Sequence, residues 1–253
     1  MRTLLALPLA LALAAAAVAD PLAYALPPGS TYTADMNVGF SPKAIGFVPV
    51  PGKSRQMQLH LTARADAGAL ALHVVRTEGP RTRTHDFRGT LSAQGPLAVD
   101  GAQFPKGPED PEPACVAMGI VIALPVLPGG EAHPGSTWKN TLTIPVPPNK
   151  YVTVKDVQVC AEYKLKSQRA DRVTVSVNAK TCDVPNPQIT LSYDGDIDVD
   201  RTSGMPLSAS LSGHFSRSDL TAVLARVSFS ITMKASAPLV AQARSLLGIG
   251  ESE

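Results

Sequence analysis

The sequence lacks the motifs that common hydrolases carry. It has no G-x-S-x-G around a nucleophilic serine and no H-E-x-x-H for a catalytic zinc ion. One S-x-x-K match, at Ser136 and Lys139, stands in a turn rather than at a helix start, and its companions S-D-N and K-T-G are absent. We therefore expect a protein that is not an enzyme, with a hydrolase of dispersed catalytic residues as an open alternative.

An excess of charge of either sign is also missing. The chain has 23 Lys and Arg against 21 Asp and Glu. This balance gives no reason to expect nucleic acid as a partner. Helix formers are sparse after the first residues, whereas Val, Thr and Ser are abundant and 23 prolines interrupt the chain. The composition predicts an all-β protein.

The first residues have the order of a secretory signal. Arg2 precedes an apolar stretch over residues 4–18, and Ala17-Val18-Ala19 offers small residues for cleavage after Ala19. The stretch is short for a membrane span of about 20 residues. We expect residues 1–19 to be removed, leaving an exported protein without a transmembrane segment that is periplasmic, associated with the cell envelope or extracellular.

A turn that occurs twice indicates an internal repeat. "PGSTY" from Pro28 recurs as "PGSTW" from Pro134, and "FRGTL" from Phe87 has its counterpart "YDGDI" from Tyr193 at the same spacing. Each of the latter pair is followed by a Gly and a Pro-Leu element, in Gly95-Pro96-Leu97 and Gly204-Met205-Pro206-Leu207. Shared anchors at one spacing favour one supersecondary unit used twice.

The predicted fold is therefore two related antiparallel β units, of sandwich or open-barrel type, with a short C-terminal helix. The segments are a first repeat at 20–104, a Pro-rich linker at 105–114, a second repeat at 115–237 and a tail at 238–253 that carries the helix. The most apolar run, "ACVAMGIVIALPVLP" from Ala114, predicts a buried strand or a short core helix.

The hairpin at residues 57–75 suggests a metal site. With the bend at Asp66-Ala67, Leu59 faces Val74 on an apolar side, and His60 faces His73 on the polar side. Two such imidazoles, with His85 as a third ligand, form a candidate Zn or Cu site, although solvent-facing histidines are the simpler reading. Apart from Zn or Cu here and Ca²⁺ at an aspartate row described below, no cofactor is expected.

The three cysteines are Cys115, Cys160 and Cys182. A second hairpin, at residues 157–179, brings Cys160 and Cys182 nearly opposite each other, one pair out of register, and a bulge would close this gap. In an exported protein this favours a structural Cys160–Cys182 disulfide, with Cys115–Cys182 as the alternative.

Two charged segments of opposite sign occupy comparable places in the two repeats. Alternation puts four carboxylates on one strand face, a candidate Ca²⁺ site that does not match the EF-hand loop: Asp194, Asp196, Asp198 and Asp200. In the first repeat a candidate anion-binding group surrounds His85 and contains Arg76, Arg81, Arg83 and Arg88. Solvated charge is the simpler reading of both segments, and their opposite signs suggest that the repeats dock head to tail, within a chain or between chains.

The run "LPVLPGGEAHPGSTW" from Leu124 resembles a pattern in secreted bacterial β-rich proteins of unknown function, in which a Leu-Pro element precedes a Pro-Gly-x-x-Trp turn that opens a strand. The resemblance implies an exported β fold and brings no catalytic residue. We expect an exported binding or structural module of the cell envelope, whose partner is an envelope component or another protein chain. The alternative is a carrier with an apolar ligand or lipid in a curved β-sheet cavity, which the apolar run lines or plugs.

Overall fold

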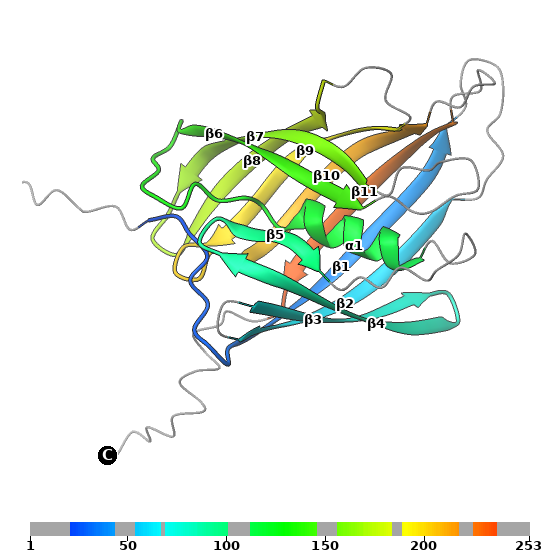
Figure 1. Cartoon of the computed structure of the whole chain (residues 1–253), viewed down its shortest axis with the longest axis horizontal. Helices are drawn as coiled ribbons and strands as arrows, with labels where there is room; N and C mark the ends of the chain where they lie inside the picture. The colour runs from blue at the N-terminus through cyan, green and yellow to red at the C-terminus, as the bar shows by residue number, and fades with distance from the viewer. Residues whose placement is uncertain are drawn as a thin grey trace, which may run out of the picture.

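The computed structural model describes residues 21–43, 54–66, 69–100, 112–145, 156–183, 189–217 and 225–236, which form one antiparallel sheet and one helix (Figure 1). The strands of the first half are β1 (Thr31–Lys43), β2 (Arg55–Asp66), β3 (Ala69–Glu78), β4 (Arg81–Ser92) and β5 (Gly95–Asp100). The helix α1 (Glu112–Ala123) follows. The second half has β6 (Thr137–Pro145), β7 (Asp156–Gln168), β8 (Arg172–Thr181), β9 (Ile189–Asp200), β10 (Pro206–Arg217) and β11 (Ala225–Ala235).

The eleven strands follow the order β5-β4-β3-β2-β1-β11-β10-β9-β8-β7-β6. Every neighbouring pair is antiparallel, and β11 joins the two halves by pairing with both β1 and β10. The all-β prediction is confirmed, and the sheet is of the open type because it does not close into a barrel. Direction alternates across the eleven strands, so the two edge strands, β5 and β6, run the same way.

The two Pro-Gly turns are built alike. Gly29 and Ser30 exchange backbone hydrogen bonds with Ala65 on β2, and Gly135 and Ser136 do the same with Leu165 on β7. Both glycines have a positive φ, 80° at Gly29 and 96° at Gly135, which a residue with a side chain rarely adopts. Each turn thus opens the first strand of its half and locks it to the second.

The two halves are arranged head to tail. Along the sheet, β5 to β1 are followed by β11 and then by β10 to β6, so both halves read from last strand to first. In the chain, β11 follows the last strand of the second half as α1 follows the last strand of the first half. The predicted docking of the basic segment on the aspartate row does not join the halves within the chain. Those segments lie on β4 and β9, which β3, β2, β1, β11 and β10 separate.

The apolar run forms a helix and a short extended stretch. Alanine and methionine favour a helix, and a helix that is apolar on all sides is stable only when it is buried on all sides. Val116, Ala117, Met118 and Ile120 point in different directions around α1, and each is at most 3% exposed. Because α1 begins at Glu112, it includes the last residues of the predicted linker, the others of which lie outside the described residues.

The predicted hairpin register is wrong by two residues. Leu61 pairs with Val74 and Thr62 with His73, because the last pair of the hairpin is Asp66 with Ala69, so the two-residue bend lies one position later than the bend that we assumed. A shift by two keeps every side chain on its face, so the predicted apolar face is retained. The predicted signal at 1–19 and the C-terminal helix lie outside the described residues.

Candidate functional site

The candidate site is the concave face of the sheet. Figure 1 shows the strands curving around α1, which lies in the space that the curve encloses. Every second residue of the strands points inward, and six such residues, each at most 2% exposed, illustrate the apolar lining: Met36, Leu59, Val74, Val159, Ile197 and Ile231. A curved sheet whose apolar face meets one helix, and not a second sheet, is the arrangement of a wrapped binding site.

Buried aromatic residues close one end of this space, and we call it the closed end. The Tyr24 hydroxyl donates to the carbonyl of Pro125 at 2.8 Å, and the Trp138 indole Nε1 donates to the carbonyl of Val126 at 2.7 Å. The Tyr163 ring stacks on Trp138 with ring centroids 5.7 Å apart. These contacts fasten the stretch after α1 to the sheet and hold the C-terminal end of the helix in place.

Burial changes the acid–base chemistry of the closed end. It raises the pKa of Tyr163 to about 12 and that of Tyr32 further above its ordinary value. Burial also raises the pKa of Tyr24 and of Tyr193, with a smaller contribution from the neighbouring Tyr163 in each case. All four phenols are therefore neutral near pH 7, so the closed end carries no phenolate there.

The middle of α1 lies against β1. A Cβ placed on Gly119 would lie 3.5 Å from Cγ2 of Val38 and 3.8 Å from Sδ of Met36, an ordinary contact distance. The absence of a side chain at Gly119 lets the helix approach the sheet closely. Two positions far apart in the chain are thus close enough to be joined.

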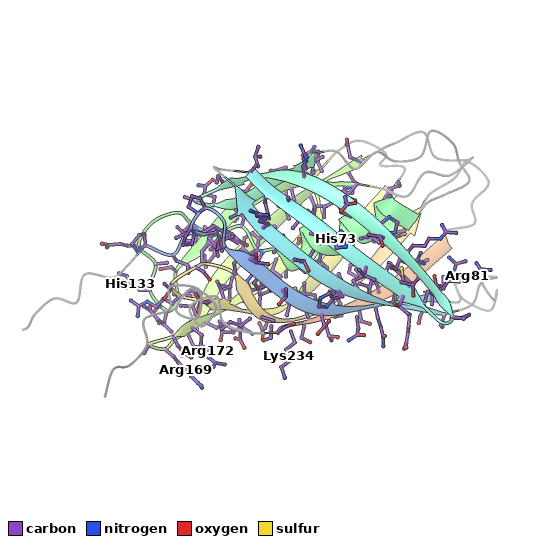
Figure 2. The ribbon with its side chains drawn as sticks, turned by 90° about the horizontal axis from the view of Figure 1, so that it is seen from below. His73, Arg81, His133, Arg169, Arg172 and Lys234 are labelled. Carbon is purple, nitrogen blue, oxygen red and sulfur yellow. A yellow bond between two sulfur atoms is a disulfide. The ribbon has the colours of Figure 1, made fainter. Side chains whose placement is uncertain are left out.

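Arginine side chains lie at the opposite end of the inner face. Figure 2 shows Arg81 at the turn between β3 and β4, at the other end of the molecule from His133, Arg169 and Arg172. We call Arg76, Glu78, Arg81 and Arg83 the arginine rim. Arg76 is only 4% exposed although it is charged, and it shares the inward alternation of Leu70, Leu72 and Val74. Sequence analysis missed its burial, although its position in that alternation was the signal.

The predicted histidine site is not assembled. The Nδ1 atom of His60 lies 2.8 Å from Oδ1 of Asp35, and Nδ1 of His73 lies 2.8 Å from Oδ1 of Asp86, both on the exposed outer face. His85 lies on the inner face, where its ring stacks on Phe87 with centroids 6.2 Å apart. Among the residues that the structure describes, no three His, Cys, Asp or Glu side chains form a possible metal site.

The four aspartates share the outer face of β9 as predicted, and three of them contact protein groups. Asp196 pairs with Lys166 at 2.6 Å, and Asp198 accepts hydrogen bonds from Thr174 and Ser208. Asp200 accepts the backbone N–H groups of Thr202 and Ser203 in the turn to β10. Asp194 is exposed beside them. These aspartates therefore link neighbouring strands and stabilise the turn to β10. The described residues form no calcium-binding arrangement.

The predicted arginines divide between the two faces of β4. Arg81 and Arg83 share the alternation of His85 and of the buried Phe87, so they belong to the inner face at its open end. Arg88 has the opposite alternation and is exposed on the outer face. The predicted group is therefore not a single surface.

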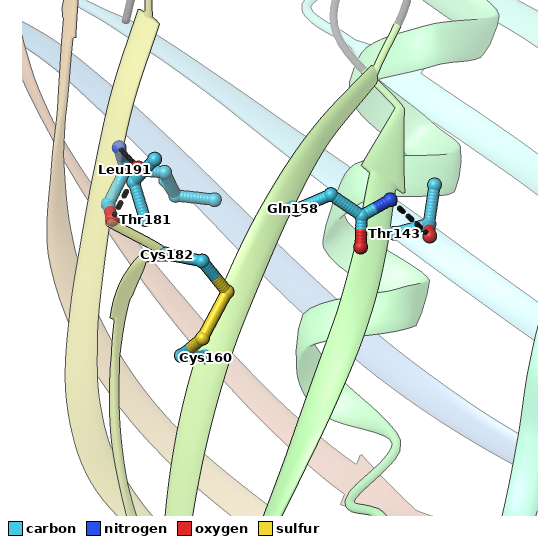
Figure 3. The surroundings of a disulfide bond; sticks show 6 residues. All are labelled: Thr143, Gln158, Cys160, Thr181, Cys182 and Leu191. Atoms are coloured by element: carbon cyan, nitrogen blue, oxygen red, sulfur yellow. Dashed lines mark hydrogen bonds between the residues drawn. A yellow bond between two sulfur atoms is a disulfide. The ribbon is translucent and has the colours of Figure 1, made fainter. Parts of the chain in front are cut away.

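The Cys160–Cys182 disulfide is confirmed, with an S–S distance of 2.09 Å and 5.0 Å between the Cα atoms (Figure 3). Cys160 pairs in the sheet with Lys180, and the backbone N–H of Cys182 donates to the carbonyl of Gln158. The register shift between Leu165 and Ser167 does not close the predicted gap, because Cys160 lies opposite Lys180 and not opposite Cys182; the disulfide joins diagonal positions of the hairpin. Cys115 is part of α1 and stays outside the disulfide.

Two polar grooves lie on the outer face. One, of about 840 Å³, crosses β6 to β9 and contains four lysines: Lys139, Lys164, Lys166 and Lys180. Lys139 lies 3.5 Å from Glu162, and Lys166 pairs with Asp196, so acidic partners meet two of the four. The other groove, of about 580 Å³, is lined by neutral side chains that include Asn37, Gln58 and Thr232. Ser136 accepts the His133 N–H within its turn, while Lys139 faces Glu162, so the serine and the lysine of the S-x-x-K match each contact another residue.

Comparison with known proteins adds no family. No protein-family model matches the chain, and no curated protein is significantly similar to it. Within the described residues, α1 is too short to cross a bilayer, and no helix meets the length and apolarity that a crossing requires.

Proposed function

We propose that the protein is an exported, non-enzymatic binding protein that carries an apolar ligand on the concave face of its sheet, and that α1 fills this site when no ligand is bound. One observation carries the proposal: an open sheet with an apolar inner face encloses a helix that is apolar on all sides. The disulfide supports export, because such bonds persist in oxidising compartments.

The space that α1 occupies is large enough for a ligand. A helix of 12 residues is about 18 Å long and about 10 Å across. Its departure would leave on the order of 1,400 Å³, more than the roughly 300–1,000 Å³ of common ligand sites. The vacated space would be lined by the same aliphatic side chains that now contact the helix.

The contacts of α1 favour a movement about its C-terminal end. Tyr24 and Trp138 hold the residues that follow the helix, and the N–H of Leu127 donates to the carbonyl of Gln94 at 2.8 Å. The helix itself meets the sheet through apolar side chains. An apolar ligand replaces such contacts without leaving polar groups unsatisfied.

An engineered disulfide that fixes α1 to β1, and that reduction releases, tests the proposal; we call it the lock. In a Cys115→Ala background, Val38→Cys and Gly119→Cys place two thiols where α1 touches β1. We expect the oxidised double variant to bind the neutral dye Nile red at least about tenfold more weakly than the reduced form, because ligand and helix compete for one space. The two single-cysteine variants and the wild type receive the same oxidation and reduction as controls.

The double-cysteine variant also shows whether α1 covers the binding site and whether the chain binds an apolar ligand at all. If the oxidised lock binds Nile red as the wild type does, α1 does not cover the site. If neither form nor the wild type binds, the carrier model is wrong. The filled core would then favour the other expectation from the sequence, a structural module of the cell envelope.

A further inference from the structure

We propose that the arginine rim binds the anionic head group of an amphiphilic ligand whose apolar tail lies on the concave face. The inference rests on the proposed function, because it names the class of ligand for that site. It predicts a carboxylate or a phosphate monoester on a long alkyl chain.

The burial of Arg76 is the first observation that supports an anion-binding site. It is one of two buried polar or charged residues in the described part of the chain, with its side chain 5% exposed. Burying a guanidinium group is unfavourable unless anions and hydrogen-bond acceptors surround it. Its Nε lies 3.1 Å from Sδ of Met57, a weak acceptor, and its other end pairs with Glu78. A buried charge at the edge of an apolar lining is a candidate position for binding an anion.

The neighbours of Arg76 add positive charge. Arg83 lies directly opposite Arg76 on β4, and Arg81 lies opposite Glu78. The strand pairing therefore places the three guanidinium groups of the rim on neighbouring positions of β3 and β4. An anion held between Arg76 and Arg83 would accept paired N–H donors from both side chains, for which guanidinium groups are well shaped.

The rim is continuous with the apolar lining. Along β3, Arg76 is followed on the same face by Val74, Leu72 and Leu70, each at most 2% exposed. A head group at Arg76 therefore places the chain of an amphiphile over aliphatic side chains. The carboxylate of Glu78 pairs with Arg76. We infer that a ligand head group displaces it.

Three ligands with one alkyl chain test the proposal: hexadecanoic acid, hexadecyl phosphate and hexadecanol, each measured by displacement of Nile red from the full chain. We expect the two anions to bind at least about tenfold more tightly than the alcohol, since a charged hydrogen bond is worth about 1.5–3 kcal/mol. The acid and the phosphate together show which anion the rim prefers.

Two rim variants and one matched control locate the effect. Arg83→Gln, at an exposed position, should reduce the preference for anions to near one, and Glu78→Gln should increase it by removing the competing carboxylate. Arg88→Gln makes the same change on the same strand but on the outer face, and should leave the preference unchanged.

Each outcome decides the matter. Equal binding of all three ligands by the wild type overturns the anion site and leaves the carrier function standing. Binding of none overturns both. An equal loss in Arg83→Gln and Arg88→Gln also overturns the site, because general charge attraction would then explain the preference.

Discussion

Gly195 on β9 lies directly against the backbone of β10. Its φ is +151°, and a Cβ placed on it would lie 2.1 Å from the carbonyl oxygen of Ser210. We expect Gly195→Ala to lower the free energy of unfolding by about 2–3 kcal/mol or more, because backbone has to move on the neighbouring strand. Urea unfolding followed by circular dichroism measures this change.

The matched control is Gly130→Ala. A Cβ at Gly130 has no atom within 4 Å, and its backbone is not left-handed. That variant should unfold within about 0.5 kcal/mol of the wild type. Equal losses in the two variants would contradict the close approach at Gly195.

The buried tyrosines make the fold sensitive to alkali. Their pKa values in the folded chain lie above the ordinary value of 10.0, and that of Tyr163 is about 12. The folded state therefore holds these protons more tightly than the unfolded state. The stabilisation is complete below pH 10 and is lost as the pH rises through the folded pKa values.

Tyr32→Phe checks this sign. The Tyr32 hydroxyl donates to the carbonyl of Pro206 at 2.6 Å, so the variant should be about 1 kcal/mol less stable at pH 7. Above pH 10 the wild type loses the contribution of Tyr32 and the variant does not, so their unfolding free energies should converge. A constant difference across urea melts at rising pH would contradict the shift.

At the scale of an element, α1 links stability to binding. Ile120 is 1% exposed, and Ile120→Ala should lower the free energy of unfolding by about 2–4 kcal/mol. If α1 competes with ligand, the same change should tighten Nile red binding about tenfold or more, because the closed state loses contacts that the open state does not have. Leu61→Ala, at an equally buried position on β2, should lose similar stability without tightening. Equal affinities of Ile120→Ala and the wild type would contradict a competing helix.

Some strands could be predicted from the sequence, whereas the pairing register and the helix α1 could not. Alternation with a period of two identified the hairpins β2–β3 and β7–β8 and the inward faces of their strands, because each face has one environment. The register of β2–β3 was missed by two residues, since alternation alone fixes a face and not a pairing. The run that forms α1 could not be resolved, because apolar residues on every side leave no period to read.

At the scale of the molecule, long-range pairing was hidden from the sequence. β11 pairs with β1, as in Met36 with Met233, and no local pattern announces a partner so distant in the chain. The same limit hid Arg76, which becomes a buried charge only when β2 and β4 flank it. The Cys160–Cys182 disulfide was predictable because both cysteines belong to one hairpin.

The strand order predicts a pattern of amide exchange. β11 is paired on both sides, whereas β5 and β6 are each paired on one side only. Hydrogen–deuterium exchange should therefore be slowest in β1, β10 and β11 and fastest, among the described strands, at alternate amides of β5 and β6. Exchange in β11 as rapid as in β5 would contradict the central place of β11.

The parallel direction of β5 and β6 has a mechanical consequence. Because β5 and β6 run in the same direction, they cannot pair with each other as antiparallel strands. Backbone hydrogen bonds between the edge strands therefore do not fix the diameter of the curved sheet. At the closed end the bond from Leu127 to Gln94 ties the region together, but moving β5 away from β6 breaks no ladder of hydrogen bonds. The sheet can therefore widen towards the arginine rim by bending alone, so a carrier built in this way, as we propose, would accept ligands of different thickness.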